Sequence, residues 1–424
     1  MRFKRPIDII SGCTRLGLRG FACCAGLWLR TSQSWGFRSI VAPFVITRLA
    51  LIVVGGASLH GFQDMPAGAH CWELKPSGEV GQVATTPGQA VLSSEAYSLV
   101  NMWSRWDAGW YYKIAKYGYT FTPNQESSTA FFPFYPMLMR AVHLVLPGAP
   151  DVWWFVAGII VSNCALIAAL IYFALLVRLD FGPRVAERAV WYFLAFPTSF
   201  FLSAVYSESV FIAVTIACFY YARRNRWAIA SVCGAAAALT RSPGVLLLIA
   251  LVAEYVVQRR FRWREIRPDA ALLLLIPAAL GGFMLYLHVR FGNFMAIRDA
   301  QAAWGHGWGR LAWPWEPFVR FIDRIEAPNE FINGSFASVA LALIALSAFK
   351  LRWSYTVYAV SSYWLTTAWG SFDSLPRYVL PIFPAFIVLA LLGRHLLFDR
   401  LYLAAAGCFS AFFMMRIALW RWVA

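Results

Sequence analysis

VWWFVAGIIVSNCALIAALIYFALLV, from Val152 to Val177, contains no charged residue. A helix rises about 1.5 Å per residue, so this run is long enough to cross the roughly 30 Å hydrocarbon core of a bilayer. Ten similar runs, bounded by charged residues or Pro/Gly clusters, lie near 40–60, 188–203, 208–222, 226–240, 243–258, 269–290, 334–350, 353–370, 376–392 and 400–420. The sequence therefore predicts an all-α polytopic membrane protein with about eleven transmembrane helices.

The composition supports a membrane protein. Of the 424 residues, 60% are hydrophobic and only 14% are charged, and the mean hydropathy is +0.58. Soluble domains carry roughly 25% charged residues, so a water-soluble fold could not cover this much apolar surface. The 20 Trp residues fit belts of aromatic side chains at the two membrane interfaces.

The charged and metal-binding residue types exclude two other classes of protein. The net charge of +16 does not indicate nucleic-acid binding, because the arginines are spread over short loops between apolar runs. The eight Cys show no CxxC pairing and the six His are scattered, so neither a metal site nor a cofactor is predicted.

The distribution of Lys and Arg predicts the orientation of the chain. The segment 1–39 is strongly basic and is expected in the cytoplasm, and 40–424 is expected to form one transmembrane domain. Two long loops, about 61–151 and 291–333, carry more acids than bases and are placed on the non-cytoplasmic face. Alternating the spans puts every short basic connection inside: Arg178–Arg188, Arg223–Arg226, Arg259–Arg267, Lys350–Arg352 and Arg394–Arg400.

Two features need separate placement. FFPFYPMLMRAVHLVL, residues 131–146, is apolar, but a twelfth crossing here would move basic loops outside. We therefore expect a re-entrant or interfacial element. Arg48 lies inside the first apolar run, and we expect its side chain to snorkel toward the cytoplasmic interface.

The first outer loop contains RWDAGWYYKIAKYGY, from Arg105 to Tyr119. Its aromatic and aliphatic residues predict an amphipathic helix on the membrane surface, since they recur at helical spacing: Trp103, Trp106, Trp110, Ile114 and Tyr117. Asp107 lies beside this stripe. A carboxylate at such an interface is a candidate general base, and the alternative is an ordinary surface helix with solvated charges.

Two further motifs lie at predicted outer turns. SAVYSES, from Ser203 to Ser209, brings Glu208 into the bilayer at the start of the next span, where an acid is costly unless paired or functional. It could also be a simple N-terminal acid that interacts with the helix dipole. LTRSPG, from Leu239 to Gly244, offers Arg241, whose planar guanidinium matches a phosphate, although an interfacial anchor has the same sequence pattern.

A fourth motif, FDSLPRY from Phe372 to Tyr378, puts Asp373 and Arg377 at another outer turn. Alone it is compatible with a polar turn. Together the motifs bring acids and arginines to one membrane rim beside two long outer loops. This arrangement suits a lipid-phosphate donor, with arginines binding the phosphate and a carboxylate activating an acceptor hydroxyl.

The first motif, the following FFPFYP (Phe131 to Pro136), YSESVF around Glu208 and LTRSPG resemble the PIG-V-like mannosyltransferases, from about Arg105 to Leu248. This family belongs to the GT-C class of membrane glycosyltransferases. The resemblance implies a GT-C-type bundle and a polyprenyl- or dolichyl-phosphate-mannose donor. It also implies a metal-independent, inverting transfer to a lipid-linked acceptor, without a nucleotide sugar.

The resemblance also suggests roles for single residues. Asp107 is the implied base, and Arg241 or Arg377 would bind the phosphate. Glu208 would orient the acceptor or Arg241. The remaining candidates for substrate binding are Arg105, Trp106, Trp110, Tyr111 and Asp373.

Eukaryotic members of the family add the second mannose of the glycosylphosphatidylinositol anchor in the endoplasmic reticulum. The compact loops of this chain are more similar to prokaryotic relatives, for which the plasma membrane is expected. Two alternatives stay open: a lipid-carrier transporter or flippase, which predicts charges continuing through the membrane, and a GT-C enzyme that transfers a different sugar.

Overall fold

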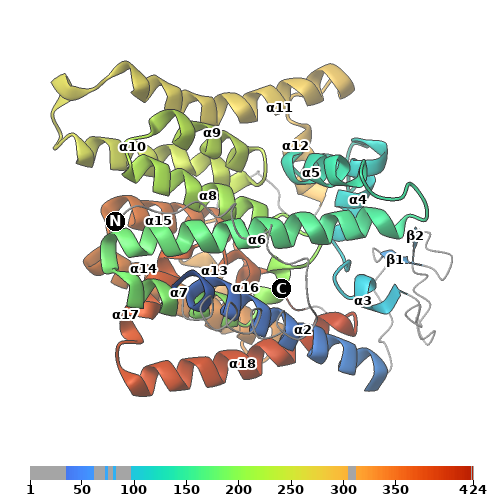
Figure 1. Ribbon diagram of the computed structural model, residues 1–424. Helices are drawn as coiled ribbons and strands as arrows, with labels where there is room; N and C mark the ends of the chain where they lie inside the picture. The colour runs from blue at the N-terminus through green and yellow to red at the C-terminus, as the bar shows by residue number, and fades with distance from the viewer. Residues whose placement is uncertain are drawn as a thin grey trace, which may run out of the picture.

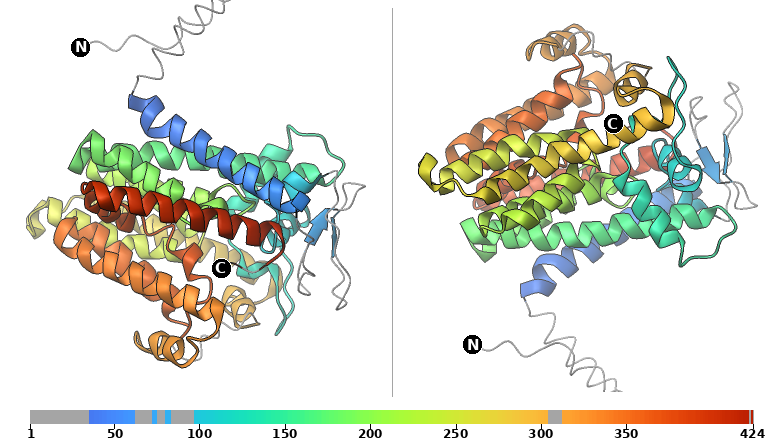
Figure 2. Two further views of the ribbon diagram at one scale, coloured as in Figure 1. Left: turned by 90° about the horizontal axis from the view of Figure 1, so that it is seen from below. Right: turned by 90° about the horizontal axis from the view of Figure 1, so that it is seen from above.

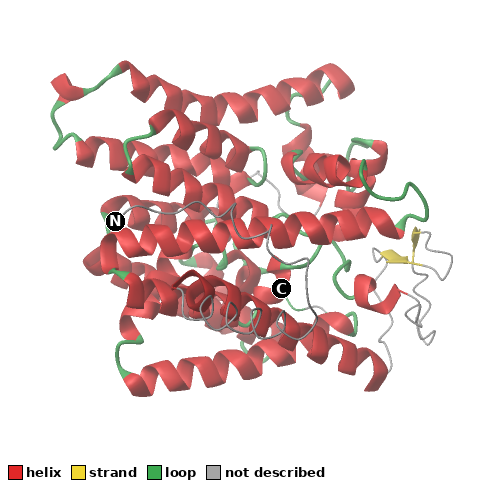
Figure 3. Ribbon diagram, in the orientation of Figure 1, coloured by secondary structure: helices red, strands yellow, loops and turns green. Residues whose placement is uncertain are grey.

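The computed structural model describes residues 35–61, 72–74, 80–82, 97–303, 312–421 and 423. Of the predicted cytoplasmic segment 1–39, residues 1–34 therefore lie outside the described residues. Within these ranges the chain is almost entirely helical, with one short antiparallel strand pair in which Trp72 lies opposite Gln82 (Figure 3).

The helices follow the apolar runs of the sequence. In chain order the described elements are η2 (Phe37–Val41), α2 (Ala42–Gly61), β1 (Trp72–Leu74), β2 (Val80–Gln82), α3 (Ser98–Asn101), α4 (Ala108–Tyr117), η4 (Ser128–Ala130), α5 (Phe134–His143), α6 (Val152–Phe181), α7 (Pro183–Ala195), η5 (Ser199–Leu202), α8 (Glu208–Arg223), α9 (Trp227–Ala238), η6 (Ser242–Leu246), α10 (Leu247–Gln258), η7 (Trp263–Glu265), η8 (Pro268–Leu274), α11 (Leu275–Phe291), α12 (Ala296–Ala303), α13 (Glu316–Asp323), α14 (Pro328–Lys350), α15 (Trp353–Thr367), α16 (Leu375–Tyr378), α17 (Phe383–Leu392) and α18 (Leu396–Ala418).

Five of the described helices are long and apolar enough to cross a membrane: Phe37–Gly61, Val152–Phe181, Pro268–Phe291, Pro328–Lys350 and Leu396–Ala418. Three shorter apolar helices accompany them: Trp227–Ala238, Ser242–Gln258 and Phe383–Leu392. The prediction of an all-α, multi-pass membrane protein is confirmed. Every predicted apolar run contains helix, and the count of eleven crossings stays a prediction.

Helix α6 runs through the middle of the bundle and packs against α5, α7 and α8 (Figure 1). Helix α9 packs on α8 and α11 packs on α9, whereas α17 joins α7 to α14. The first and last long helices, α2 and α18, lie side by side, as both views of Figure 2 show. Aromatic rings make many of the contacts in the interior. For example, the ring of Phe386 meets the rings of Phe193 and Phe196 edge to face.

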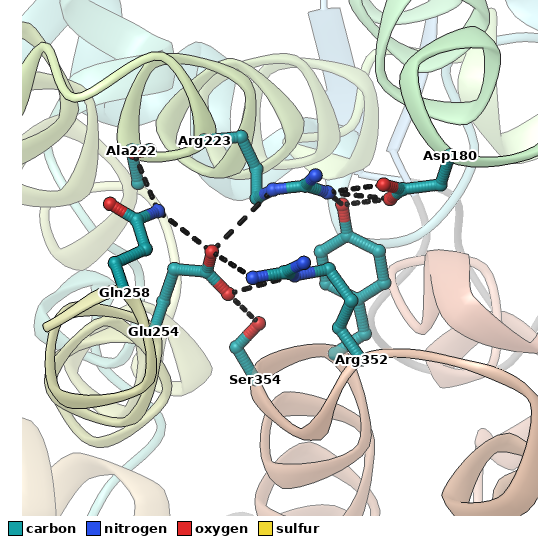
Figure 4. A network of polar contacts seen from close by, with 8 residues as sticks. Asp180, Ala222, Arg223, Glu254, Gln258, Arg352 and Ser354 are labelled. Carbon is teal, nitrogen blue, oxygen red and sulfur yellow. Dashed lines mark hydrogen bonds and ion pairs between the residues drawn. The ribbon is translucent and has the colours of Figure 1, made fainter. Parts of the chain in front are cut away.

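One polar network joins four helices at one end of α6 (Figure 4). The carboxylate of Glu254 in α10 accepts hydrogen bonds from Arg352 (3.0 Å) and Ser354, and lies 3.5 Å from Nε of Arg223. Arg223, the last residue of α8, also pairs with Asp180 of α6 at 2.6 Å. The buried carboxylate is therefore fully paired with charged and polar neighbours, as burial of a charge requires.

This network supports the predicted topology. It brings the connections at 178–188, 223–226 and 350–352 to the same end of the bundle. Lys116 pairs with Asp151 at 2.7 Å beside the opposite end of α6. Helix α5 has only 10 residues, about 15 Å, and so is too short to cross a bilayer, in agreement with its expected interfacial or re-entrant placement.

Candidate functional site

The candidate site is built around a break between α7 and α8. Pro197 disfavours helix at the preceding residue, and α7 ends at Ala195. The chain then passes through the short turn η5 and resumes as α8 at Glu208. All residues from Phe196 to Glu208 are buried, so the break is an internal part of the protein and not a surface loop.

Glu208 is the centre of the site. Glu208 is 0% exposed, and its Oε1 lies 2.5 Å from Nη1 of Arg241 and 3.3 Å from Nε of Arg377. As the first residue of α8, its carboxylate is also stabilised by the positive end of the helix dipole. Glu208 begins a helix, as expected, and its charge is compensated by two arginines from distant segments.

Arg241 is placed by the motif that contains it. The next residues form η6, with Pro243 in its first turn, as the sequence predicts. Gly244 packs directly on the backbone of Ala237, where any Cβ would overlap a carbonyl group. Burial has the largest effect on the pKa of Arg241 and lowers it, but Glu208 together with Tyr111 and Tyr378 raises it, so the net pKa lies above the ordinary value. Arg241 therefore stays charged.

Arg377 bridges the two acids. It lies in the single-turn helix α16, and Ser374 before it adopts the left-handed φ of +61° that turns the chain into this helix. Its Nη1 donates to Oδ2 of Asp107 at 2.8 Å, and its Nη2 donates to the Tyr378 hydroxyl at 3.2 Å. Its Nε lies 3.3 Å from Oε1 of Glu208, within ion-pair distance but without a hydrogen bond, so the guanidinium lies between the two acids.

Asp107 differs from Glu208 in its access to solvent. Its side chain is 21% exposed, and no hydrogen bond or ion pair from the described residues reaches Oδ1. The preceding Trp106 has a φ of +48°, which is an outlier for a bulky side chain. Such strain is typical of functional sites. Helix α4 therefore begins only after Asp107, which sits at its N-cap with one carboxylate oxygen available.

Tyr111 joins the site from α4. Its hydroxyl donates to Oγ of Ser207 at 2.8 Å, and Nη1 of Arg241 donates to the same oxygen at 3.3 Å. Burial raises the pKa of Tyr111, so its hydroxyl keeps its proton and remains a donor. Ser207 thus connects α4 to the arginine and precedes Glu208 in the chain.

The structure brings together five of the predicted site residues: Asp107, Tyr111, Glu208, Arg241 and Arg377. The others lie apart from this cluster. Arg105 donates to the carbonyl of Ala418 at 3.0 Å and stacks on Trp420, and Trp106 packs edge to face on the same ring. These two residues thus contact the end of α18.

Two more predicted residues make no contact with the acids or arginines of the cluster. Trp110 stacks on Phe131 with ring centroids 5.9 Å apart. Asp373 is exposed, and no hydrogen bond or ion pair from the described residues reaches it.

The expected surface helix at Arg105–Tyr119 is wrong in its placement. Trp110, Tyr111, Tyr112 and Ile114 are buried, and the helix packs against α5 and α6. The sequence pattern assumed a helix continuing from Trp103, whereas the left-handed turn at Trp106 starts it later and rotates its faces.

The expected snorkelling of Arg48 is also wrong. Its guanidinium points into the bundle, where the residue is 6% exposed, and donates to the carbonyls of Ser199 (2.9 Å) and Leu194 (3.3 Å). The break after α7 offers hydrogen-bond acceptors closer than the membrane surface.

Residues 80–289 match the family model described as Mannosyltransferase (PIG-V). The match covers just under half of the 424 residues and agrees with the resemblance that the motifs indicate. It includes Asp107, Glu208 and Arg241, whereas Arg377 lies beyond it and is brought to the same cluster by the fold.

Solved structures similar to this chain include two membrane proteins. ArnT from Cupriavidus metallidurans, bound to undecaprenyl phosphate, is 15% identical with a TM-score of 0.46, over 82% of this chain and 59% of that chain. An oligosaccharyltransferase from Archaeoglobus fulgidus is 12% identical with a TM-score of 0.48, over 90% of this chain and 56% of that chain. The chain thus spans less than two thirds of either. A comparison with curated protein sequences found no match.

Sequence reasoning did not select Ser207, Tyr378 or Arg48 as site residues. Ser207 and Tyr378 lie inside motifs that it did select, one residue from Glu208 and Arg377. Their hydroxyl groups beside a charged residue could have identified them, because a buried charge needs several hydrogen-bond partners. For Arg48 the signal was its position in the middle of an apolar run, which is costly without a partner.

Proposed function

We propose that this protein transfers mannose from a polyprenyl- or dolichyl-phosphate-mannose to a lipid-linked acceptor. The observation that carries the proposal is the compact cluster of two acids and two arginines, in which one carboxylate oxygen of Asp107 is available. The reaction takes place at the non-cytoplasmic face, where loop charges place this cluster. The protein would lie in the plasma membrane of a prokaryote or the endoplasmic reticulum of a eukaryote.

Asp107 is the proposed general base. Arg377 holds Oδ2, and Oδ1 can accept the proton of an acceptor hydroxyl. As the proton moves to Asp107, the acceptor oxygen forms a bond to the anomeric carbon of mannose. The bond from that carbon to the phosphate oxygen breaks, and the lipid phosphate leaves with the electron pair. This single displacement inverts the anomeric configuration.

Arg241 is the proposed phosphate-binding residue. Its contacts with Glu208 and Ser207 both use Nη1, so Nη2 and Nε can pair with two phosphate oxygens. Both terminal nitrogens of Arg377 already donate within the protein, Nη1 to Asp107 and Nη2 to Tyr378, and its proposed role is to orient Asp107. Glu208 holds both arginines through one oxygen and is too deeply buried to meet the acceptor. These charges, already in place, can stabilise the leaving phosphate without a metal.

Substitutions of the two arginines should change different kinetic constants. We expect Arg241→Lys to raise the KM for the lipid donor roughly 10- to 100-fold with a smaller change in kcat, because a charged bidentate contact is lost. Arg377→Lys should mainly lower kcat, because the base loses its orientation. Arg324→Lys, an exposed arginine that ends α13, is the matched control. A larger KM effect at Arg377 than at Arg241 would reverse the two roles.

The test of the proposed function follows the sugar into a new covalent product. Vesicles containing the protein receive polyprenyl-phosphate-[14C]mannose and a lipid acceptor extract, and the lipids are separated after incubation. We expect label in a second lipid that is resistant to mild acid, which cleaves the donor. A flippase would move the donor between leaflets without forming this product. Label that stays in the donor alone would refute the transferase.

A transporter is less well supported by the buried charges. Arg48, which lies within the first long helix, donates to backbone carbonyls and serine hydroxyls and is therefore fixed in place. The acids and arginines of the site are paired with one another at one end of the bundle. Neither group forms a charged path across the membrane.

A further inference from the structure

The buried break Phe196–Ser207 has carbonyl groups that no helix hydrogen bond satisfies. Within a membrane-spanning bundle, irregular backbone is stable only where other protein groups bind it. Groups of α2, of α6 and of the backbone just before Arg377 form hydrogen bonds with it. The break connects directly to Glu208, so its stability bears on the site.

The most extensive of these contacts comes from Arg48 of α2. Its Nη1 donates to the Ser199 carbonyl at 2.9 Å and to Oγ of Ser203 at 3.2 Å. Its Nη2 donates to the Leu194 carbonyl at 3.3 Å and to Oγ of Ser199 at 3.2 Å. A single guanidinium thus ties the last turn of α7 to both ends of η5.

Two further contacts continue from the break toward the site. Oγ of Ser162 in α6 donates to the Ala204 carbonyl at 2.7 Å. The Thr198 hydroxyl donates to the Pro376 carbonyl at 2.7 Å, in the residue before Arg377. The break therefore carries Glu208 at one end and holds the helix of Arg377 near the other.

Close packing makes this arrangement intolerant of movement. Gly158 of α6 faces Val205, and a Cβ on the glycine would lie 2.6 Å from that side chain. The amide of Val205 donates to the carbonyl of Trp103 at 2.9 Å, close to the start of the segment that carries Asp107. A shift of the break would therefore change the position of all four charged site residues relative to one another.

We propose that Arg48 is a positioning residue of the transferase: it fixes the Phe196–Ser207 break and thereby the relative placement of Glu208 and Arg377. The inference concerns the geometry of the candidate site and, for its effect on catalysis, rests on the proposed function. A charge at this depth is costly in a membrane, so a set of four hydrogen bonds to one segment is the physical reason for its presence.

The test compares Arg48→Met and Arg48→Lys with wild type by hydrogen–deuterium exchange and by transfer kinetics. Methionine keeps the length of the side chain and removes its donors. Lysine keeps the charge but cannot donate to both carbonyls in a fixed fork. Ser58→Ala is the matched control, since Ser58 is a buried polar residue of the same helix whose hydroxyl, among the described residues, bonds to Val54 alone.

We expect Arg48→Met to raise deuterium uptake in residues 196–207 and leave 350–356, at the opposite network, unchanged. The kcat should fall about 100-fold, as for small misplacements of catalytic groups. Arg48→Lys should show intermediate values for both, and Ser58→Ala should match wild type. The kcat is measured well below the unfolding midpoint of each variant, where a role in global stability alone leaves it unchanged.

Wild-type uptake in 196–207 of Arg48→Met would overturn the inference, as would a rise spread evenly over the whole bundle. If Arg48→Met fails to fold, the same comparison is made with Arg48→Lys and Thr198→Val. If wild type transfers no mannose, the proposed function fails, and the exchange comparison still decides whether Arg48 holds the break.

Discussion

Asp107→Asn is expected to lower the kcat of mannose transfer by roughly 100- to 10,000-fold, the range that a positioned general base contributes. Asparagine keeps the shape of the side chain and an oxygen for Arg377, but its amide cannot take the acceptor proton. The KM for the lipid donor should change little, because in the proposed mechanism the phosphate is bound by Arg241 and not by Asp107. Initial rates at several donor concentrations, in vesicles with equal amounts of protein, give both constants.

Two further variants bracket this result. Asp107→Ala should be at least as impaired as Asp107→Asn, because it removes the base and leaves Nη1 of Arg377 without its partner. Asp323→Asn, an exposed acid at the end of α13, should behave as wild type. A kcat for Asp107→Asn within threefold of the control variant would exclude Asp107 as the base.

Glu208→Ala is expected to destabilise the protein by about 3–5 kcal/mol, because removing one partner of a buried ion pair leaves uncompensated buried charge. Here two arginines lose the same partner, and both would face each other without an acid between them. The unfolding midpoint in detergent should fall, and transfer should be lost even at low temperature. Glu208→Gln keeps the volume and should be less destabilised, while also losing transfer.

The control for this prediction is Glu326→Ala, an exposed acid that should leave the midpoint unchanged. A second comparison uses Glu208→Leu combined with Arg241→Met, in which apolar side chains replace a buried pair. Such replacements are often neutral for stability, so the double variant should be more stable than Glu208→Ala. Equal midpoints for Glu208→Ala and wild type would show that Glu208 does not hold the arginines.

The spans and motifs could be predicted because they depend on local sequence. Hydropathy identifies runs such as Val152–Val177, and the charges of short loops assign their ends to one side. The same locality explains why Asp107, Glu208, Arg241 and Arg377 could be chosen as candidates. Each is a charged residue at the boundary of an apolar run, where it is costly unless it has a role.

The pairing within the site could not be predicted, since it depends on tertiary contacts. Arg377 meets Asp107 across a sequence separation of 270 residues, and nothing local to either residue indicates the other. The proposed assignment of the phosphate to Arg241 likewise depends on tertiary contacts, because it rests on which nitrogens of Arg241 and Arg377 already donate to other residues. The direction of Arg48 depends on a helix break in a distant segment, which a single apolar run does not reveal.

The helix after Asp107 illustrates a second limit of local patterns. The spacing of Trp103, Trp106 and Trp110 fits one continuous helix, and only the left-handed turn at Trp106 interrupts it. Bulky residues rarely adopt this conformation, so the sequence pattern favours the wrong start. The same turn leaves Asp107 at a helix start beside Arg377, which is the arrangement that the proposed mechanism needs.

The most direct test of the proposed chemistry is a comparison of two sugar donors in vesicles that contain only this protein. With the lipid acceptor extract present, initial rates of product formation are measured with polyprenyl-phosphate-[14C]mannose and, separately, with GDP-[14C]mannose and no lipid donor. We expect labelled product from the lipid phosphate alone. Product formed from GDP-mannose in the absence of the lipid donor would contradict it.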